Sequence, residues 1–264
     1  MTDLQPTIPN IPKDLSAHRI PGLPPSFFYI PNFLTEYEEA QILQKIPSQR
    51  WTHLTKRRLQ AHPSTLTQKN TLIASPLPPY LTTTPPISTR FSELKVFEGT
   101  KHGAPNHVLI NEYKPGEGIM PHEDGDAYSP VVATISLSGT LCLELTPHPS
   151  KAGSAIGDSN AEKEEQVDAG GEETKKRWRI LQEPRSLLVT TGEAYAALLH
   201  GIEHVERDEG LGVETVVNWE LLGDETKARI REAGGVNERS TRVSLTYRDV
   251  LKVSKIGLGI LGRR

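Results

Sequence analysis

Alternating apolar and polar residues dominate the chain after Asn106 and predict a series of short β-strands. The expected strands are 107–113, 131–137, 140–145, 185–189, the residues leading to 198–200, and 241–250. They are rich in β-branched residues and are separated by turn sequences such as Lys114-Pro115-Gly116. This spacing is typical of an all-β sandwich or barrel rather than of alternating strands and helices.

Helical periodicity is clear in one segment near the start of the apolar pattern. Leu34, Ala40, Leu43 and Ile46 recur among acidic and amide residues at close to helical spacing, so we expect an amphipathic helix there. One helix followed by many strands predicts a mainly β fold with supporting helices, in which a jelly-roll double sheet forms the core.

The remaining segments lack a strong periodic pattern. Residues 1–26 are rich in proline and are expected to form an extended arm, followed by a domain over 27–250 and a C-terminal tail over 251–264. Within the domain, residues 51–86 are expected to form exposed loops or a short hairpin, and 226–238 a charged loop. The acidic, glycine-containing stretch at about 147–178 has few large apolar residues and is expected to be a flexible insertion.

Composition narrows the function classes. The 30 basic and 33 acidic residues leave a net charge of −3, so any binding to nucleic acid has to be local. Cys142 is the single cysteine and cannot form an internal disulfide, which predicts a reducing compartment, the cytoplasm and nucleus. No signal peptide is recognisable, and no apolar run approaches the roughly 20 residues of a spanning helix, so no membrane association is expected.

The first candidate site is a His-x-Asp pair, His122 and Asp124, directly after a glycine-rich turn. In an extended segment this spacing puts both side chains on one side. Two histidines and one carboxylate on one face of Fe(II) leave the other positions open for a co-substrate and oxygen. By itself, such a pair is also typical of a solvated turn.

A second histidine would have to come from elsewhere in the chain. His200 ends the apolar run 196–199 and precedes Gly201, where the backbone can turn sharply, so it is the preferred third ligand. His204 remains an alternative.

Strict alternation in residues 242–248 puts Arg242, Ser244, Thr246 and Arg248 on one face of a strand. Arginines that face the interior require an anion, and a dicarboxylate such as 2-oxoglutarate offers two carboxylates for them. The alternative is an edge strand whose arginines face solvent. Asn111 and Tyr113 share a face of another strand and could donate to the same ligand.

In that order, Asn111-x-Tyr113, His122-x-Asp124, His200 and Arg242-x5-Arg248 resemble the AlkB family of iron(II)/2-oxoglutarate dioxygenases. The stretches 106–125, 183–189 and 199–202 are similar to the branch formed by the sixth eukaryotic AlkB homologue.

The resemblance implies a double-stranded β-helix in which His122, Asp124 and His200 bind Fe(II). It implies 2-oxoglutarate as co-substrate, held by a polar set: Asn111, Tyr113, Arg242, Ser244 and Arg248. The family often has asparagine where Ser244 stands. The implied reaction consumes molecular oxygen and 2-oxoglutarate and removes an N-methyl group as formaldehyde.

For the substrate, the resemblance implies alkylated DNA or RNA. Asp126 stands where several members contact a cationic base, but it also suits an ordinary turn. Trp51, Lys56, Arg57 and Arg58 stand in the region of the family's nucleotide-recognition lid, where a solvated basic loop is the alternative.

Three other readings stay open at this point. The same oxygenase could act on a protein or a small molecule, the fold could serve as a weakly catalytic nucleic-acid-binding module, or the metal could be a structural zinc in a cupin-like site. A monomer is expected.

Overall fold

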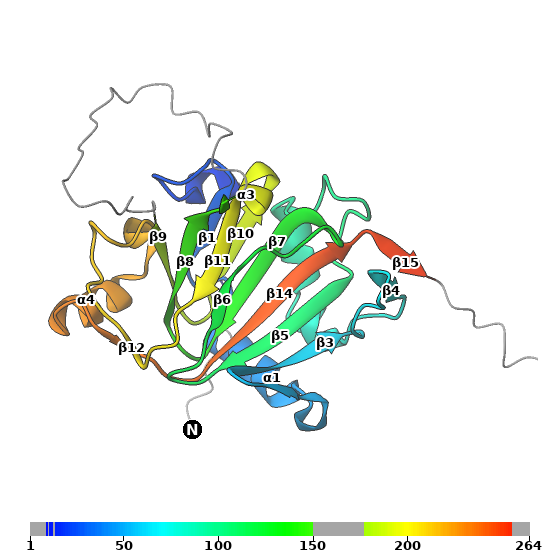
Figure 1. The fold of residues 1–264 in the computed structure, drawn as a ribbon, viewed down its shortest axis with the longest axis horizontal. Helices are drawn as coiled ribbons and strands as arrows, with labels where there is room; N and C mark the ends of the chain where they lie inside the picture. The colour runs from blue at the N-terminus through cyan, green and yellow to red at the C-terminus, as the bar shows by residue number, and fades with distance from the viewer. Residues whose placement is uncertain (1–8, 10, 13, 150–176, 255–264) are drawn as a thin grey trace, which may run out of the picture.

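Two facing β-sheets form the centre of the protein (Figure 1). The computed structural model describes residues 9, 11–12, 14–149 and 177–254. The larger sheet contains, in spatial order, β1 (Phe27–Ile30), β10 (Leu187–Thr191), β7 (Tyr128–Leu137), β14 (Arg242–Val250), β5 (His107–Tyr113), β3 (Arg57–His62) and β2 (Thr52–Leu54). The smaller sheet contains β6 (Ile119–His122), β11 (Leu198–Ile202), β8 (Leu141–Pro147) and β9 (Trp178–Gln182).

Neighbouring strands in both sheets are mostly distant in sequence, and all pairs within the two sheets are antiparallel. This crossing of the chain between two sheets is the double-stranded β-helix, or jelly-roll, that the strand pattern predicted. Two small pairs flank it, β12 (Arg207–Asp208) with β13 (Asn237–Glu238), and β4 (Thr71–Ile73) with β15 (Lys252–Ser254). Figure 1 shows β4 and β15 at one end of the molecule.

The central strand β14 illustrates why the sheet has two different faces. Val243, Leu245 and Tyr247 point to the outer face and join a core with Phe33 and Phe91. The alternate residues line a cavity between the sheets. The predicted alternation is therefore confirmed, and the arginines of this strand do not face solvent, since Arg242 and Arg248 are 2% and 6% exposed.

Helices cover the outer face of the larger sheet. α1 (Glu36–Lys45) begins with a capping box between Thr35 and Glu38. The carboxylate of Glu38 also pairs with Arg90 of α2 (Ile87–Glu93) at 2.5 Å, and both side chains are largely buried. This pair holds the two helices together over the core.

The other helices of the described residues are α3 (Gly192–Ala197), α4 (Asp224–Glu232) and the 3-10 turns Leu15–His18, Ser48–Arg50, Pro79–Leu81 and Trp219–Leu221. Within the described part of the chain, no helix has the length and apolar character that crossing a membrane requires.

Several sequence-based expectations need correction. Residues 1–26 are not an extended arm throughout, because residues 15–18 form a 3-10 turn and Ile20 is fully buried. The predicted charged loop at 226–238 contains most of α4, whose one buried residue, Ile230, makes too weak an apolar pattern to recognise.

Three further predicted segments involve strands. Within 51–86, where exposed loops or a short hairpin were expected, residues 52–62 form the hairpin β2–β3, which joins the larger sheet and buries Gln60 and His62. The predicted tail over 251–264 begins with β15, and its remainder, 255–264, lies outside the described residues. Of the predicted insertion at about 147–178, residues 150–176 also lie outside them, while its end contributes the first residue of β9.

Candidate metal centre and its cavity

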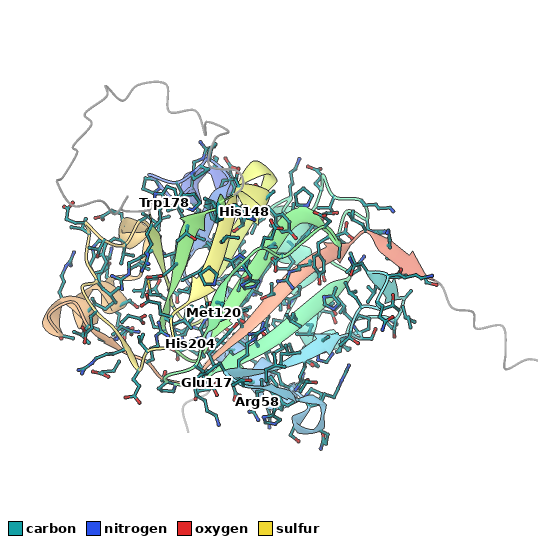
Figure 2. The ribbon with its side chains drawn as sticks, viewed as in Figure 1. Arg58, Glu117, Met120, His148, Trp178 and His204 are labelled. Atoms are coloured by element: carbon teal, nitrogen blue, oxygen red, sulfur yellow. The ribbon has the colours of Figure 1, made fainter. Side chains whose placement is uncertain are left out.

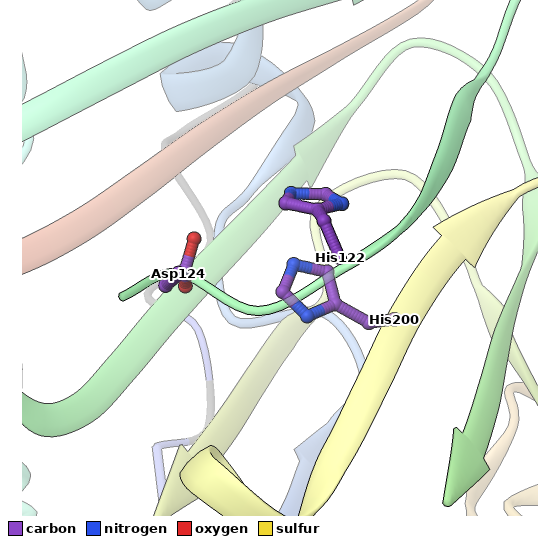
Figure 3. Close-up of side chains that lie close together, drawn as sticks. All are labelled: His122, Asp124 and His200. Carbon is purple, nitrogen blue, oxygen red and sulfur yellow. The ribbon is translucent and has the colours of Figure 1, made fainter. Parts of the chain in front are cut away.

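Three potential metal ligands meet between the sheets (Figure 3). His122 projects from the end of β6, His200 from β11, and Asp124 from the segment after β6. One ligand atom from each lies within 4.8 Å of the others, and the two imidazole centroids are 4.3 Å apart. Among the described residues this is the one such group, and His204 does not belong to it.

The pairing of β6 with β11 places the two histidines opposite each other, since His200 and His122 are direct partners in the sheet. Gly201 permits this approach, because a Cβ at that position would lie 3.0 Å from Pro121 N. His122 Nδ1 donates to Met120 O at 2.9 Å, which leaves Nε2 as the basic nitrogen available to a metal.

The electrostatics favour the protonation states that a metal needs. Burial lowers the pKa of His200 to about 4, so this imidazole is neutral and can donate its lone pair. Burial acts to raise the pKa of Asp124, but Arg248 and the two imidazoles outweigh it and lower that pKa. Arg248 also forms an ion pair with Asp124. The site therefore presents the neutral imidazole of His200 and the carboxylate of Asp124, with His122 Nε2 beside them.

The segment that carries Asp124 is also held by a contact from α3. Tyr195 Oη donates to Gly125 O at 3.0 Å. Gly125 has φ +81°, a conformation that strongly favours glycine. Contacts to Asp124 from Arg248 and to Gly125 from Tyr195 thus hold this turn in place.

A cavity of about 280 Å³ opens beside the cluster and is lined by both sheets. Its walls include apolar side chains of the smaller sheet, such as Leu143, Leu145 and Ile202. The face opposite carries Arg242 and Arg248, which lie in register beside Tyr113 and His107 of β5. Volume and lining suit a small, highly polar ligand.

Arg242 is the most deeply buried charge of this cavity. It donates to Ser136 Oγ at 2.8 Å and to Gln182 Oε1. Burial lowers the pKa of Arg242 to about 10, which still leaves it a cation at neutral pH. Its Nε and that of Arg248 have no hydrogen-bond partner among the described residues. Arg242 is a buried cation without a carboxylate partner among the described residues, and together with the free Nε of Arg248 it favours an anionic ligand.

Neutral polar groups complete this wall. Asn111 pairs with Ser244 in the sheet, and both line the cavity. The Asn111 amide oxygen is also buried without a partner among the described residues. Burial raises the pKa of Tyr113, so its phenol stays protonated and can donate.

The residues predicted to contact the substrate lie in different positions relative to the cavity. Arg57 lines the cavity, whereas Lys56 and Asp126 are exposed and do not. Arg58 lies over the ring of Trp51 at 4.4 Å and pairs with Glu112 at 2.6 Å.

Sequence reasoning missed Gln182, Tyr195 and Tyr128, which all line the cavity. A signal existed for Gln182, since it follows the apolar pair Ile180-Leu181 at the end of a segment of strand type. The two tyrosines carried no signal, because their place depends on how the chain returns to the cluster.

A two-histidine, one-carboxylate cluster next to paired buried arginines, inside a jelly roll, is the arrangement of a non-haem iron oxygenase that uses a dicarboxylate co-substrate. The comparison with protein families agrees. The chain belongs to the 2OG-Fe(II) oxygenase superfamily, whose family model matches residues 26–248. It is therefore an oxidoreductase of a family that uses Fe(II), 2-oxoglutarate and oxygen.

Sequence relatives that are named as AlkB homologues confirm the resemblance. The chain is 36% identical over 255 residues to "Probable RNA/DNA demethylase ALKBH6" of Danio rerio, covering 95% of this chain and 96% of that protein. It is 28% identical over 201 residues to "Alkylated DNA repair protein ALKBH8 homolog" of Arabidopsis thaliana, covering 74% and 54% of the two chains. Among solved structures, OsALKBH1 is similar with a TM-score of 0.48 and 16% identity, over 86% of this chain and 99% of that one.

Proposed function

We propose that this protein oxidatively demethylates N-alkylated bases in DNA or RNA, with Fe(II) held by His122, Asp124 and His200. The observation that carries the proposal is the convergence of these three ligands beside a cavity with two buried arginines. The similarity to a protein named as a probable RNA/DNA demethylase, over nearly its whole length, supports the substrate class.

The residues present fit the metal and its co-substrate. Two imidazole nitrogens and one carboxylate on one side match a facial triad for Fe(II). Arg242 and Arg248 would hold the two carboxylates of 2-oxoglutarate, with Asn111, Tyr113 and Ser244 beside them. When bound, the iron and 2-oxoglutarate supply the oxygen-dependent oxidation.

The protein itself binds the metal and the co-substrate, orients the substrate and excludes water. The apolar wall formed by Leu143, Leu145 and Ile202 keeps solvent from the side of the cavity opposite the arginines. The low pKa values of His200 and Asp124 keep both in the ligating form at neutral pH. What remains is to hold a methyl group at a fixed distance from the metal, which is a positioning role.

A base in a duplex cannot reach such a cavity, so the substrate would be single-stranded or turned out of the stack. The hairpin β2–β3 carries the exposed Lys56, which suits contact with a phosphate. Asp126 is exposed outside the cavity, so the geometry does not support its predicted contact with a base. A monomer in the cytoplasm and nucleus stays part of the proposal.

The test is succinate formation by the full chain with Fe(II), 2-oxoglutarate and oxygen, with and without methylated single-stranded oligonucleotides. Methylated oligonucleotides should raise turnover above the level seen with unmethylated ones. His122→Ala should reduce turnover to background while leaving thermal unfolding of the metal-free protein unchanged, because it removes a ligand and little packing.

Two outcomes would contradict the proposal differently. Turnover of 2-oxoglutarate that no oligonucleotide stimulates would point to a protein or small-molecule substrate. No oxygen-dependent turnover under any condition would leave a binding module, or a structural metal such as zinc.

A further inference from the structure

Arg57 and Arg58 are neighbours in sequence but lie on opposite faces of β3. Arg58 is already engaged, since Glu112 accepts a hydrogen bond from its Nη2 at 2.6 Å and Trp51 lies beneath its guanidinium. Arg57 instead faces the cavity, on the side where Leu59 pairs with Asn111. Figure 2 labels Arg58 low in the view, near the start of β3.

The guanidinium of Arg57 has no neutralising partner in the described structure. No carboxylate lies within 4.0 Å of it, and its Nε is buried without a hydrogen-bond partner among the described residues. Its charge does reach the cavity, because it opposes the rise that burial imposes on the pKa of Tyr113.

The hairpin that carries Arg57 is bonded to the segment that leads into β6, the strand that ends at His122. Gly118 N, just before β6, donates to Lys56 O at 3.2 Å. β3 itself pairs with β5 over five positions. Arg57 is therefore held by backbone contacts on both sides rather than by its own side chain.

A cationic base would need an acidic partner beside the metal, and the cavity offers few. Asp124 is committed to the cluster and to Arg248. Glu123 is the other carboxylate of the lining, but its side chain is 41% exposed and its Oε2 lies 3.9 Å from His148 Nε2, so it lies at the mouth. Asp126 is exposed and is not part of the cavity lining, and its charge acts on the lining residue Tyr195 from outside.

We propose that Arg57 selects the substrate by charge, so that the accepted group is a neutral N-methylated base presenting a carbonyl or ring-nitrogen acceptor to the guanidinium. Such an acceptor takes a charge-assisted hydrogen bond from Arg57, whereas a cationic base brings a like charge into the same cavity. A backbone phosphate is a weaker match, because Arg57 shares its cavity with the metal ligands and so faces the reacting group.

This inference rests on the proposed nucleic-acid substrate and specifies its chemical class. Four single-stranded oligonucleotides with the same flanking sequence, each carrying one modified base, test the nucleic-acid substrate and its charge class separately. N6-methyladenine and 3-methyluracil are neutral with acceptors, and 1-methyladenine and 3-methylcytosine are cationic. Formaldehyde release by the iron-loaded enzyme gives kcat/KM, and anisotropy with Mn(II) in place of iron gives Kd without turnover.

The wild-type protein should favour the neutral pair by about tenfold or more in both measurements. Arg57→Glu should reverse this order, and Arg57→Met should bring the two pairs close together. Lys69→Glu makes the same charge change at an exposed site outside the cavity and should keep the wild-type order.

Three results would overturn the inference. Preference of the wild type for the cationic pair would refute it while leaving the demethylase proposal intact, as would an Arg57→Glu variant that changes both pairs equally. No response to any of the four, with 2-oxoglutarate still consumed, would refute the nucleic-acid substrate and with it the role of Arg57.

Discussion

At the scale of single residues, the charge of Arg242 depends on the neutrality of its neighbours. The two side chains that accept its hydrogen bonds are a serine and a glutamine, Ser136 and Gln182. A carboxylate at either position would satisfy the guanidinium internally and compete with a bound anion. Gln182 is therefore a positioning residue that holds Arg242 without neutralising it.

Replacing Gln182 with glutamate tests this point with almost no change in shape. Gln182→Glu should weaken the binding of 2-oxoglutarate by about tenfold or more, because the new carboxylate pairs with Arg242. Calorimetric titration of 2-oxoglutarate into Mn(II)-loaded protein without oxygen measures this, and KM for 2-oxoglutarate should rise more than kcat falls. Gln182→Met, which adds no charge, should have a smaller effect. Equal affinity in wild type and Gln182→Glu would exclude the role.

At the scale of secondary structure, the metal cluster depends on how closely β6 and β11 approach. Gly201 is where they meet, and a Cβ there would contact Pro121 N and Ile119 O at 3.0 and 3.2 Å. These are backbone atoms, which cannot rotate away as a side chain can. Any added side chain has to move one strand, and each strand carries a histidine of the cluster.

Gly201→Ala should therefore lower metal affinity by about tenfold or more, since it displaces His200 from His122. It should also destabilise the metal-free protein by about 1–3 kcal/mol through overpacking. Competition titration with Co(II) measures the first effect, and urea unfolding the second. Gly99→Ala is the matched control, because a Cβ there has nothing within 4 Å. An unchanged Co(II) affinity in Gly201→Ala would show that the strands tolerate separation.

At the scale of the whole molecule, buried histidines with lowered pKa values make stability depend on pH, and besides His200 two of them, His62 and His107, lie outside the metal cluster. His62 lies between Arg50 and Gln60, and burial, with the charge of Arg50 and that of His107 once it is protonated, lowers the pKa of His62 to about 4. Burial and Arg248 lower the pKa of His107 to about 4 as well. Both start from an ordinary value of 6.5, so the unfolded chain binds protons first as pH falls.

The free energy of unfolding should therefore fall as pH drops from about 6.5 to about 4, with each histidine contributing on the order of 3 kcal/mol over the window. His62→Gln removes one of these three histidine titrations and should make the dependence shallower. Urea unfolding of metal-free protein at several pH values measures the slope. His53→Gln, at an exposed position, should leave it unchanged. The same slope in His62→Gln and wild type would contradict the assignment.

The strands that carry the site were predictable because each combines alternating apolar and polar residues with side chains that can bind a metal or an anion. Residues 107–113 form β5 as predicted, and the alternation in 242–248 placed both arginines on the cavity face. Segments with little apolar content were not predictable. Ile20 is buried within a proline-rich stretch, since the N-terminal segment folds back so that Ile20 N bonds to Phe27 O. The buried side of α4 is reduced to Ile230.

The amino-acid sequence alone determined the ligand types, their order along the chain and the face on which the arginines stand, because these follow from side-chain chemistry and the two-residue period of a strand. The tertiary structure decided which of two adjacent arginines enters the cavity unpaired, that Asp126 stays outside, and that Gln182 and Tyr195 reach the site. Each of these depends on contacts between segments far apart in the chain, and no local pattern encodes which segments meet.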